Sequence, residues 1–166
     1  LKEKKRSWIF TSATLSVNKE FKLFVDTLGL HNALQLHLAS PFDYPTQALL
    51  FSPRGMPDTQ SQYFVEAGVA AAIPIIETLK GRTFLLFTSH RALDKAALYL
   101  ENKITLPILK QGSKPKRKLI EEFKNLGNAV LLGTSSFWYG VDVRGDTLSC
   151  VIIDKLPFST PDDPIL

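Results

Sequence analysis

The segment of this chain with the richest chemistry runs from Gly133 to Asp142, Gly-Thr-Ser-Ser-Phe-Trp-Tyr-Gly-Val-Asp. It holds three consecutive hydroxyl residues, three aromatic residues, a glycine and a carboxylate. Hydroxyls and free backbone N–H groups suit phosphate oxygens, and aromatic rings can stack on bases. The aromatics alone favour a simpler interpretation, in which they anchor the loop in the core. Asp142 could bind a ribose hydroxyl, orient an arginine or cap a turn.

Two shorter segments carry similar groups. Thr88 and Ser89 follow an apolar run, where their hydroxyls could cap a helix or donate to a phosphate. Gln111-Gly-Ser113 leads into a basic stretch, so its turn could hold a phosphate or simply join a solvated helix. His90 is expected to be a capping or surface residue, because no Ser/His/Asp set accompanies it.

Several familiar signatures are missing from the sequence. It has no G-x-x-x-x-G-K-[ST] phosphate loop, no G-x-G-x-x-G fingerprint and no paired His/Cys spacing for a metal. The run Val151-Ile-Ile-Asp154 resembles a Mg²⁺-binding strand. Without the phosphate loop, however, we expect Asp154 to be structural, and we expect no metal site in this chain.

The elements that must position these groups follow from apolar periodicity and from Gly and Pro punctuation. We expect helices over Asn18–Leu28, Gln60–Lys80, Arg91–Asn102 and Pro115–Leu126. We expect strands over Trp8–Ser12, Leu34–Leu38, Gln47–Phe51, Arg82–Phe87, Pro107–Leu109, Ala129–Leu132 and Ser149–Ile153. The alternation after residue 81 predicts an α/β fold, a parallel sheet with helices on its faces. Ligands of such sheets bind at the carboxyl ends of the strands, where the polar segments lie.

Two helical faces are predicted in detail. Leucines and alanines at helical spacing give the helix expected over Arg91–Asn102 one apolar face. The basic helix expected over Pro115–Leu126 has an apolar stripe of its own. The predicted core positions are Leu93, Ala96, Ala97 and Leu100 in the former and Leu119, Ile120, Phe123 and Leu126 in the latter.

Length and composition indicate the class of protein. The chain has 166 residues, 45% of them apolar and 22% charged, which is typical of a globular domain. No apolar run approaches the roughly 18 residues that span a bilayer, so we expect no membrane association. Its one cysteine, Cys150, suits a reducing compartment, and we expect a cytoplasmic protein. The missing initiator Met suggests a piece of a longer protein, and nothing indicates an oligomeric state.

The net charge of +4 is concentrated in two stretches. Residues 1–6 carry four basic residues against one acidic residue, and residues 110–124 carry six against two. Such patches attract polyanions, but they are also common on solvated helix faces.

Taken together, the ordered segments resemble superfamily 2 helicases of the DinG (XPD-like) branch. Thr11-Ser-Ala-Thr-Leu15 looks like motif III and Phe87-Thr-Ser89 like motif IV. Gln111-Gly112 with Arg117 and Phe123 resembles the motif that follows. The block from Gly133 to Asp142, continued by Val143-Arg-Gly-Asp146 and by Val151-Ile-Ile-Asp-Lys-Leu-Pro-Phe158, is similar to motif V. The tail Pro161-Asp-Asp-Pro164 fits the same branch. Tyr139 departs from it, since many relatives carry Glu there.

This resemblance implies a RecA-like parallel sheet with helices on both faces, the second lobe of a helicase. Residues 1–30 would be the end of lobe one, including motif III, and residues 31–166 would be lobe two, cut before motif VI. The family couples ATP hydrolysis to 5′-to-3′ movement on single-stranded DNA, in repair or replication. The phosphate loop and the transition-state arginine would lie outside this chain, so the isolated chain should be inactive.

The resemblance also implies residue roles. Thr11, Ser12, Ala13 and Thr14 would couple the nucleotide site to DNA binding, and Gly140 and Asp142 would line the ATP cleft. Thr88, Ser89, Gln111, Arg117, Thr134 and Ser135 would bind nucleic acid.

The cofactors and partners implied are those of the whole protein. They are ATP with Mg²⁺, in some members an iron–sulfur cluster outside this region, single-stranded DNA, and the first lobe of the same chain. Two other interpretations stay open from the residues: a non-enzymatic RecA-like module that binds nucleic acid or protein, and a doubly wound enzyme for a small phosphorylated ligand.

Overall fold

The computed structural model describes residues 6–138 and 140–157. The chain forms two compact units, residues 1–51 and residues 52–166. The predicted features at Tyr139, at Pro161–Pro164 and in the basic residues before Arg6 lie outside the described residues. The assignment of residues 1–30 and 31–166 to two motor lobes stays a prediction.

The first unit contains two short helices, α1 (Lys22–Leu28) and α2 (Tyr44–Gln47). The prediction that α1 starts at Asn18 is wrong, because Asn18 and Lys19 have positive φ values of 51° and 68°. They form the centre of a tight turn in which Val17 and Glu20 exchange backbone hydrogen bonds of 2.9 Å. A right-handed helix therefore begins only after this turn.

The three strands predicted in the first unit are wrong. Residues 8–12, 34–38 and 48–51 adopt no strand conformation, and Gln47 ends α2. Apolar residues such as Trp8, Leu34 and Leu49 are exposed. Alternating apolar residues predict a strand only where a second strand satisfies the backbone, and no such partner lies beside them in the described part of this unit.

The second unit is built on a parallel sheet of four strands. They are β1 (Thr83–Leu86), β2 (Ile108–Lys110), β3 (Val130–Gly133) and β4 (Cys150–Ile153), in the order β2-β3-β1-β4. All pairings are parallel, with Leu86 level with both Gly133 and Ile153. The predicted α/β fold is confirmed.

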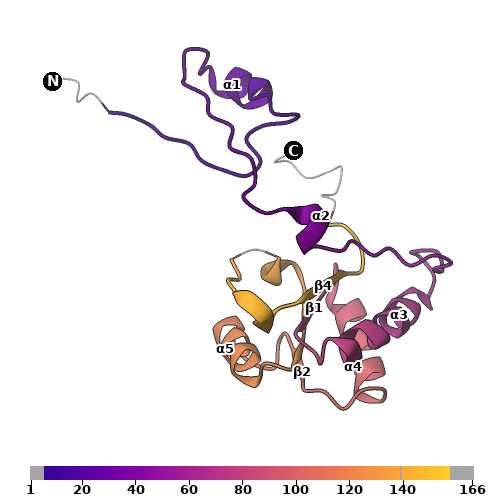
Figure 1. The fold of residues 1–166 in the computed structure, drawn as a ribbon. Helices are drawn as coiled ribbons and strands as arrows, with labels where there is room; N and C mark the ends of the chain where they lie inside the picture. Colours follow the sequence, from indigo (N-terminus) through magenta and orange to yellow (C-terminus); the bar gives the residue numbers. More distant parts are fainter. Residues whose placement is uncertain (1–5, 139, 158–166) are drawn as a thin grey trace. The chain divides into compact units, whose positions relative to one another are not determined.

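Helices cover both faces of this sheet (Figure 1). On one face α3 (Phe64–Thr78) and α4 (His90–Glu101) pack on Leu85 and Leu132. On the other face α5 (Lys116–Leu126) packs on Phe84 and Leu131. The rings of Phe84 and Phe123 meet edge-to-face, with their centroids 4.8 Å apart.

The predicted helical faces agree closely with the buried positions. All four predicted core residues of α4 are buried, as are Leu119 and Phe123 of α5, whereas Leu126 is exposed. The helix α3 starts four residues later than predicted, because Asp58 and Ser61 accept hydrogen bonds from the backbone N–H groups of Gln60 and Tyr63 and form turns there. It runs through Pro74, which faces solvent.

Two short 3₁₀ helices complete the unit. They are η1 (Ser135–Phe137), directly after β3, and η2 (Gly145–Thr147), before β4. None of the helices within residues 6–138 and 140–157 is long and apolar enough to cross a bilayer.

Candidate nucleic-acid interface

The carboxyl ends of the four strands come level along one edge of the sheet. Beyond the strands proper, the ladder continues through N–H groups of Phe87 to Gly133 O at 2.8 Å, Gln111 to Leu132 O at 3.0 Å and Asp154 to Leu86 O at 3.1 Å. The residues that follow the strands therefore form one row. We call Thr88, Gln111, Thr134 and Asp154 the strand-end cluster.

Gln111 and Thr134 form one pair within this cluster. Gln111 Oε1 accepts hydrogen bonds from the Thr134 backbone N–H at 2.6 Å and from Thr134 Oγ1 at 3.1 Å. Thr134 is only 5% exposed. The Gln111 amide N–H groups have no partner among the described residues. The pair fixes the start of the Gly133–Asp142 segment against the end of β2. The amide N–H groups of Gln111 are left able to donate hydrogen bonds to a ligand.

Thr88 and Asp154 form a second pair. Asp154 Oδ1 accepts from the Thr88 backbone N–H at 3.1 Å, and Asp154 Oδ2 lies 3.5 Å from Thr88 Oγ1. Burial raises the pKa of the Asp154 carboxyl, and hydrogen bonds from Lys155 and Thr88 oppose that rise. Asp154 was expected to be structural, and its contacts are of that kind.

Ser89 and Ser135 sit at the starts of two helices. Ser89 Oγ accepts a hydrogen bond of 3.2 Å from the Ala92 N–H, so its hydroxyl caps α4. Ser135 opens η1 and is exposed. Thr88 and Ser89 are exposed too, so three of the predicted phosphate ligands are accessible in this conformation, whereas the hydroxyl of Thr134 is buried against Gln111.

The aromatic residues of the Gly133–Asp142 segment behave as anchors where the structure describes them. Phe137 is buried, and Trp138 packs against the same cluster of apolar residues. Lys116 Nζ lies 5.4 Å from the centre of the Phe137 ring and donates to the carbonyl of Ser136. These contacts fasten the segment to the first turn of α5.

The two residues predicted for the ATP cleft lie on exposed backbone. Gly140 has a φ of 65°, and no atom lies within 4 Å of the place a Cβ would take. Asp142 is 74% exposed in its side chain and pairs with Arg144, with Oδ2 3.4 Å from Nε. Gly140 and Arg117 line one shallow hollow of about 510 Å³.

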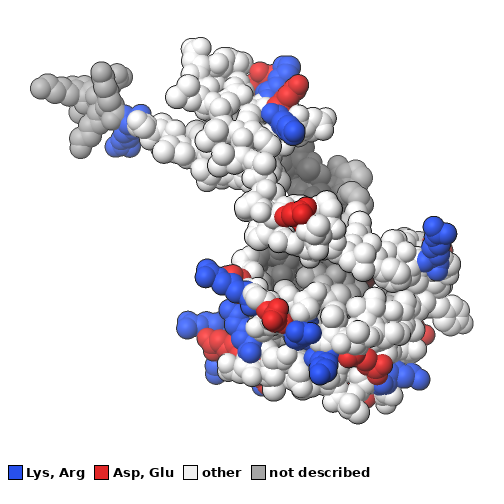
Figure 2. Space-filling model, viewed as in Figure 1, with Lys and Arg blue, Asp and Glu red and all other residues white. Residues whose placement is uncertain are grey.

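The basic stretch is partly neutralised. Figure 2 shows Lys and Arg side chains gathered over α5 with Asp and Glu among them. Arg117 pairs with Glu121 at 3.0 Å, Lys110 with Asp94 at 2.9 Å and Lys114 with Glu122 at 2.6 Å. Most of these side chains are exposed, and exposed pairs are worth little. The mixture of signs fits a solvated face.

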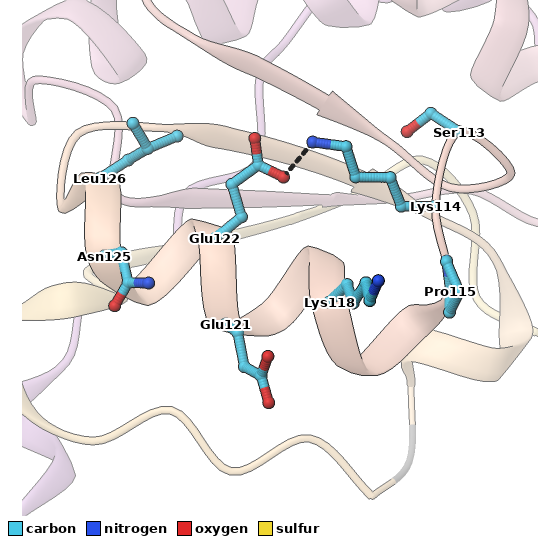
Figure 3. A pocket seen from close by; sticks show the side chains of 8 residues that line it. All are labelled: Ser113, Lys114, Pro115, Lys118, Glu121, Glu122, Asn125 and Leu126. Carbon is cyan, nitrogen blue, oxygen red and sulfur yellow. Dashed lines mark hydrogen bonds and ion pairs between the residues drawn. The ribbon is translucent and has the colours of Figure 1, made fainter.

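A second, larger hollow lies over this charged surface and not at the strand ends. It measures about 670 Å³ and is shallow (Figure 3). Residues from the turn before α5 and from the exposed side of that helix line it, including the Lys114–Glu122 pair. It offers no enclosed chamber for a small phosphorylated ligand.

The predicted coupling residues belong to the first unit. Thr11, Ser12, Ala13 and Thr14 are exposed, and Ser12 Oγ accepts a hydrogen bond from the Thr14 N–H at 3.1 Å. Their role in coupling stays a prediction.

Comparison with known proteins settles the family. The helicase C-terminal domain family matches residues 72–166, which is more than half of the chain. The chain belongs to this family. The match covers the whole sheet and the strand-end cluster, so the RecA-like assignment of the helicase C-terminal domain agrees with the observed parallel sheet.

Individual relatives point to the same branch. The chain is 52% identical over 99% of its length to the ATP-dependent DNA helicase YoaA of Escherichia coli K12. It is 34% identical over 95% of its length to the ATP-dependent helicase DinG of Mycobacterium tuberculosis H37Ra, and 33% identical over 98% to the 3′-5′ exonuclease DinG of Bacillus subtilis 168. The predicted resemblance to the DinG branch is confirmed. The chain spans 26%, 24% and 18% of these relatives.

Sequence reasoning missed the partner of Asp154 and the contacts of Lys155. Lys155 Nζ donates to the carbonyl of Thr59 at 2.6 Å and lies 5.1 Å from the centre of the Phe64 ring. The position of Asp154 directly after an apolar run was the available signal. Its partner Thr88 lies 66 residues away in the sequence, so no local pattern could identify it.

Proposed function

We propose that this chain is the second motor lobe of an ATP-dependent DNA helicase that moves 5′ to 3′ on single-stranded DNA in repair or replication. The observation that carries the proposal is the family match over the sheet, together with relatives named as ATP-dependent helicases. The strand-end cluster supports it, because it gathers polar groups where parallel sheets bind ligands.

The DNA-binding part of the proposal rests on exposed donors at the strand ends. The hydroxyls of Thr88 and Ser135 and the amide of Gln111 can donate to phosphate oxygens along one strand of DNA. Arg117 would add a charged contact to a phosphate once its ion pair with Glu121 is broken. Thr134 would act mainly through Gln111, and a direct phosphate contact from it requires that pair to open. These contacts read the backbone and carry no sequence information.

The ATP cleft in this proposal lies between two lobes of the whole protein. Gly140 lets the backbone approach a nucleotide closely, and Asp142 on the same loop presents an exposed carboxylate. Nucleotide would favour the closed pair of lobes, and release would let them open, so DNA contacts on each lobe tighten and loosen in turn.

The Mg²⁺ that accompanies ATP is not held by this chain in the proposal. No group of three or more His, Cys, Asp or Glu side chains lies together in the described ranges 6–138 and 140–157. An iron–sulfur cluster held by four cysteines would likewise need residues outside this chain, which has one cysteine. A cytoplasmic location belongs to the proposal as well.

Asp142→Ala in the full-length protein tests the proposal. We expect ATP-driven unwinding to be abolished while the affinity for single-stranded DNA stays within about twofold, because a carboxylate adds nothing to phosphate binding. Glu101→Ala is the control, since Glu101 is an exposed carboxylate of α4, outside the motifs, whose side chain has no partner among the described residues. Unwinding at the wild-type rate by Asp142→Ala would contradict the assignment.

A non-enzymatic lobe is the second candidate. It is favoured by the Bacillus subtilis relative, which carries the same region but is named for exonuclease activity. In that case the whole protein would bind DNA through the strand-end cluster without ATP turnover. A folded full-length protein that binds DNA and hydrolyses no ATP would establish this candidate over the motor.

A further inference from the structure

Asp154 makes a side-chain hydrogen bond to a turn that lies just beyond the strand ladder. The backbone of Asp154 continues the β1–β4 ladder through its N–H, and its side chain then reaches across to the Thr88 N–H at 3.1 Å. Thr88 stands between the end of the β1 ladder at Phe87 and the cap of α4 at Ser89. The carboxylate therefore supplies a third attachment at the middle of this turn.

The neighbouring lysine fixes the same strand end from the other side. Lys155 Nζ donates to Thr59 O, in the segment that leads into α3, and lies over the Phe64 ring. The Lys155 backbone N–H donates to Asp154 Oδ1 at 2.6 Å, the oxygen that also accepts from Thr88. The residues after β4 are thus tied to both neighbouring segments, and the carboxylate has a set orientation.

The geometry assigns Asp154 to positioning and not to binding. A carboxylate repels a phosphate, so Asp154 cannot itself hold DNA at this edge. The Thr88 turn is exposed, so water can replace a lost bond and the fold should tolerate the loss. What the loss removes is the fixed position of the Thr88 and Ser89 donors.

We propose that Asp154 is a positioning residue that holds the Thr88–Ser89 turn in the place from which it contacts a DNA phosphate. The inference rests on the proposed function for its ligand, but the contact between Asp154 and Thr88 can be tested without DNA.

The experiment compares variants of the full-length protein by two measurements. The first is backbone amide hydrogen exchange in the peptide that spans residues 87–90. The second is the concentration of single-stranded oligonucleotide that gives half-maximal stimulation of ATP hydrolysis. Asp154→Ala removes the acceptor, and Asp154→Asn keeps an oxygen for the Thr88 N–H. Glu101→Ala is the control, because Glu101 is an exposed carboxylate of α4 with no partner among the described residues.

For Asp154→Ala we expect exchange in residues 87–90 to be about tenfold faster, the factor that corresponds to one lost hydrogen bond. The half-maximal DNA concentration should rise by a similar factor, and the rate at saturating DNA should change much less. Asp154→Asn should recover most of both effects, and Glu101→Ala should match the wild type.

Unchanged exchange in Asp154→Ala would overturn the inference, as would faster exchange throughout the second unit, which marks a general structural role. An unchanged half-maximal concentration in a protein that DNA stimulates would also overturn it. A wild-type protein that DNA does not stimulate would instead overturn the proposed function. The exchange comparison would still decide whether Asp154 holds the turn.

Discussion

Burial and hydrogen bonding act in opposite directions on the pKa of the Asp154 carboxyl. Burial disfavours its ionised form, whereas the Thr88 and Lys155 N–H groups favour it, and the net effect raises its pKa above the ordinary 3.8. The folded chain then binds more protons at this residue than the unfolded chain does. Its contribution to stability is therefore greatest in acid and declines as the pH rises through the usual aspartate range up to the raised pKa.

Asp154→Asn should abolish this decline. Unfolding of the 166-residue chain by urea, followed by tryptophan fluorescence between pH 3 and pH 7, measures it, because Trp138 is packed in the second unit whereas Trp8 is exposed. We expect the stability of the variant relative to wild type, measured as the difference in their free energies of unfolding, to increase as pH rises.

Asp146→Asn, which removes an exposed carboxylate whose side chain has no partner among the described residues, is the control for charge loss. A relative stability of Asp154→Asn that falls with rising pH would show that the hydrogen bonds outweigh burial. It would then be the ionised carboxylate that stabilises the turn.

At the scale of elements, the packing of η1 on the end of β3 depends on a glycine. A Cβ at Gly133 would lie 2.7 Å from Cγ of Phe137, which is buried. Lys116 Nζ of α5 also lies against the Phe137 ring. Displacing this ring would therefore disturb the start of the Gly133–Asp142 segment.

Gly133→Ala should therefore destabilise the chain by about 1–3 kcal/mol, the usual cost of overpacking. Gly68→Ala is the matched control. Gly68 lies inside α3, where a Cβ would meet only Met56 Cε at an ordinary 3.6 Å, and Ala is preferred in helices by up to about 1 kcal/mol. Urea unfolding should show opposite signs for the two variants. Equal effects would contradict the close approach at Phe137.

The elements of the second unit were predictable because local pattern and tertiary packing agree there. The apolar faces of α4 and α5 are spaced as helices require, and the strands are apolar runs, of which β1 and β3 are fully buried. The first unit was not predictable in this way. Its alternating apolar residues have the pattern of strands, but a strand forms only with a partner, and sequence spacing does not supply one.

The pairs of the strand-end cluster were beyond sequence reasoning for a different reason. Gln111 meets Thr134 only because β2 lies beside β3, and Thr88 meets Asp154 only because β4 lies beside β1. Alternating strands and helices predict a parallel sheet but do not determine its strand order. The candidate residues could therefore be named from motifs, whereas their division into exposed donors and buried supports required the structure.

At the scale of the whole molecule, we propose that this chain is half of a motor. In the proposed function it would supply donors for DNA and one wall of a nucleotide cleft. It lacks the phosphate loop, and the residues of its described part supply no metal cluster. Because catalysis of phosphoryl transfer depends on positioning and charge from all these parts, neither half should turn over ATP alone.

The most direct measurement is ATP hydrolysis by the full-length protein with and without single-stranded DNA, beside the 166-residue chain under the same conditions. We predict strong stimulation by DNA in the full-length protein and no turnover by the chain. Hydrolysis by the purified chain, or a folded full-length protein with no DNA-stimulated hydrolysis, would contradict the account.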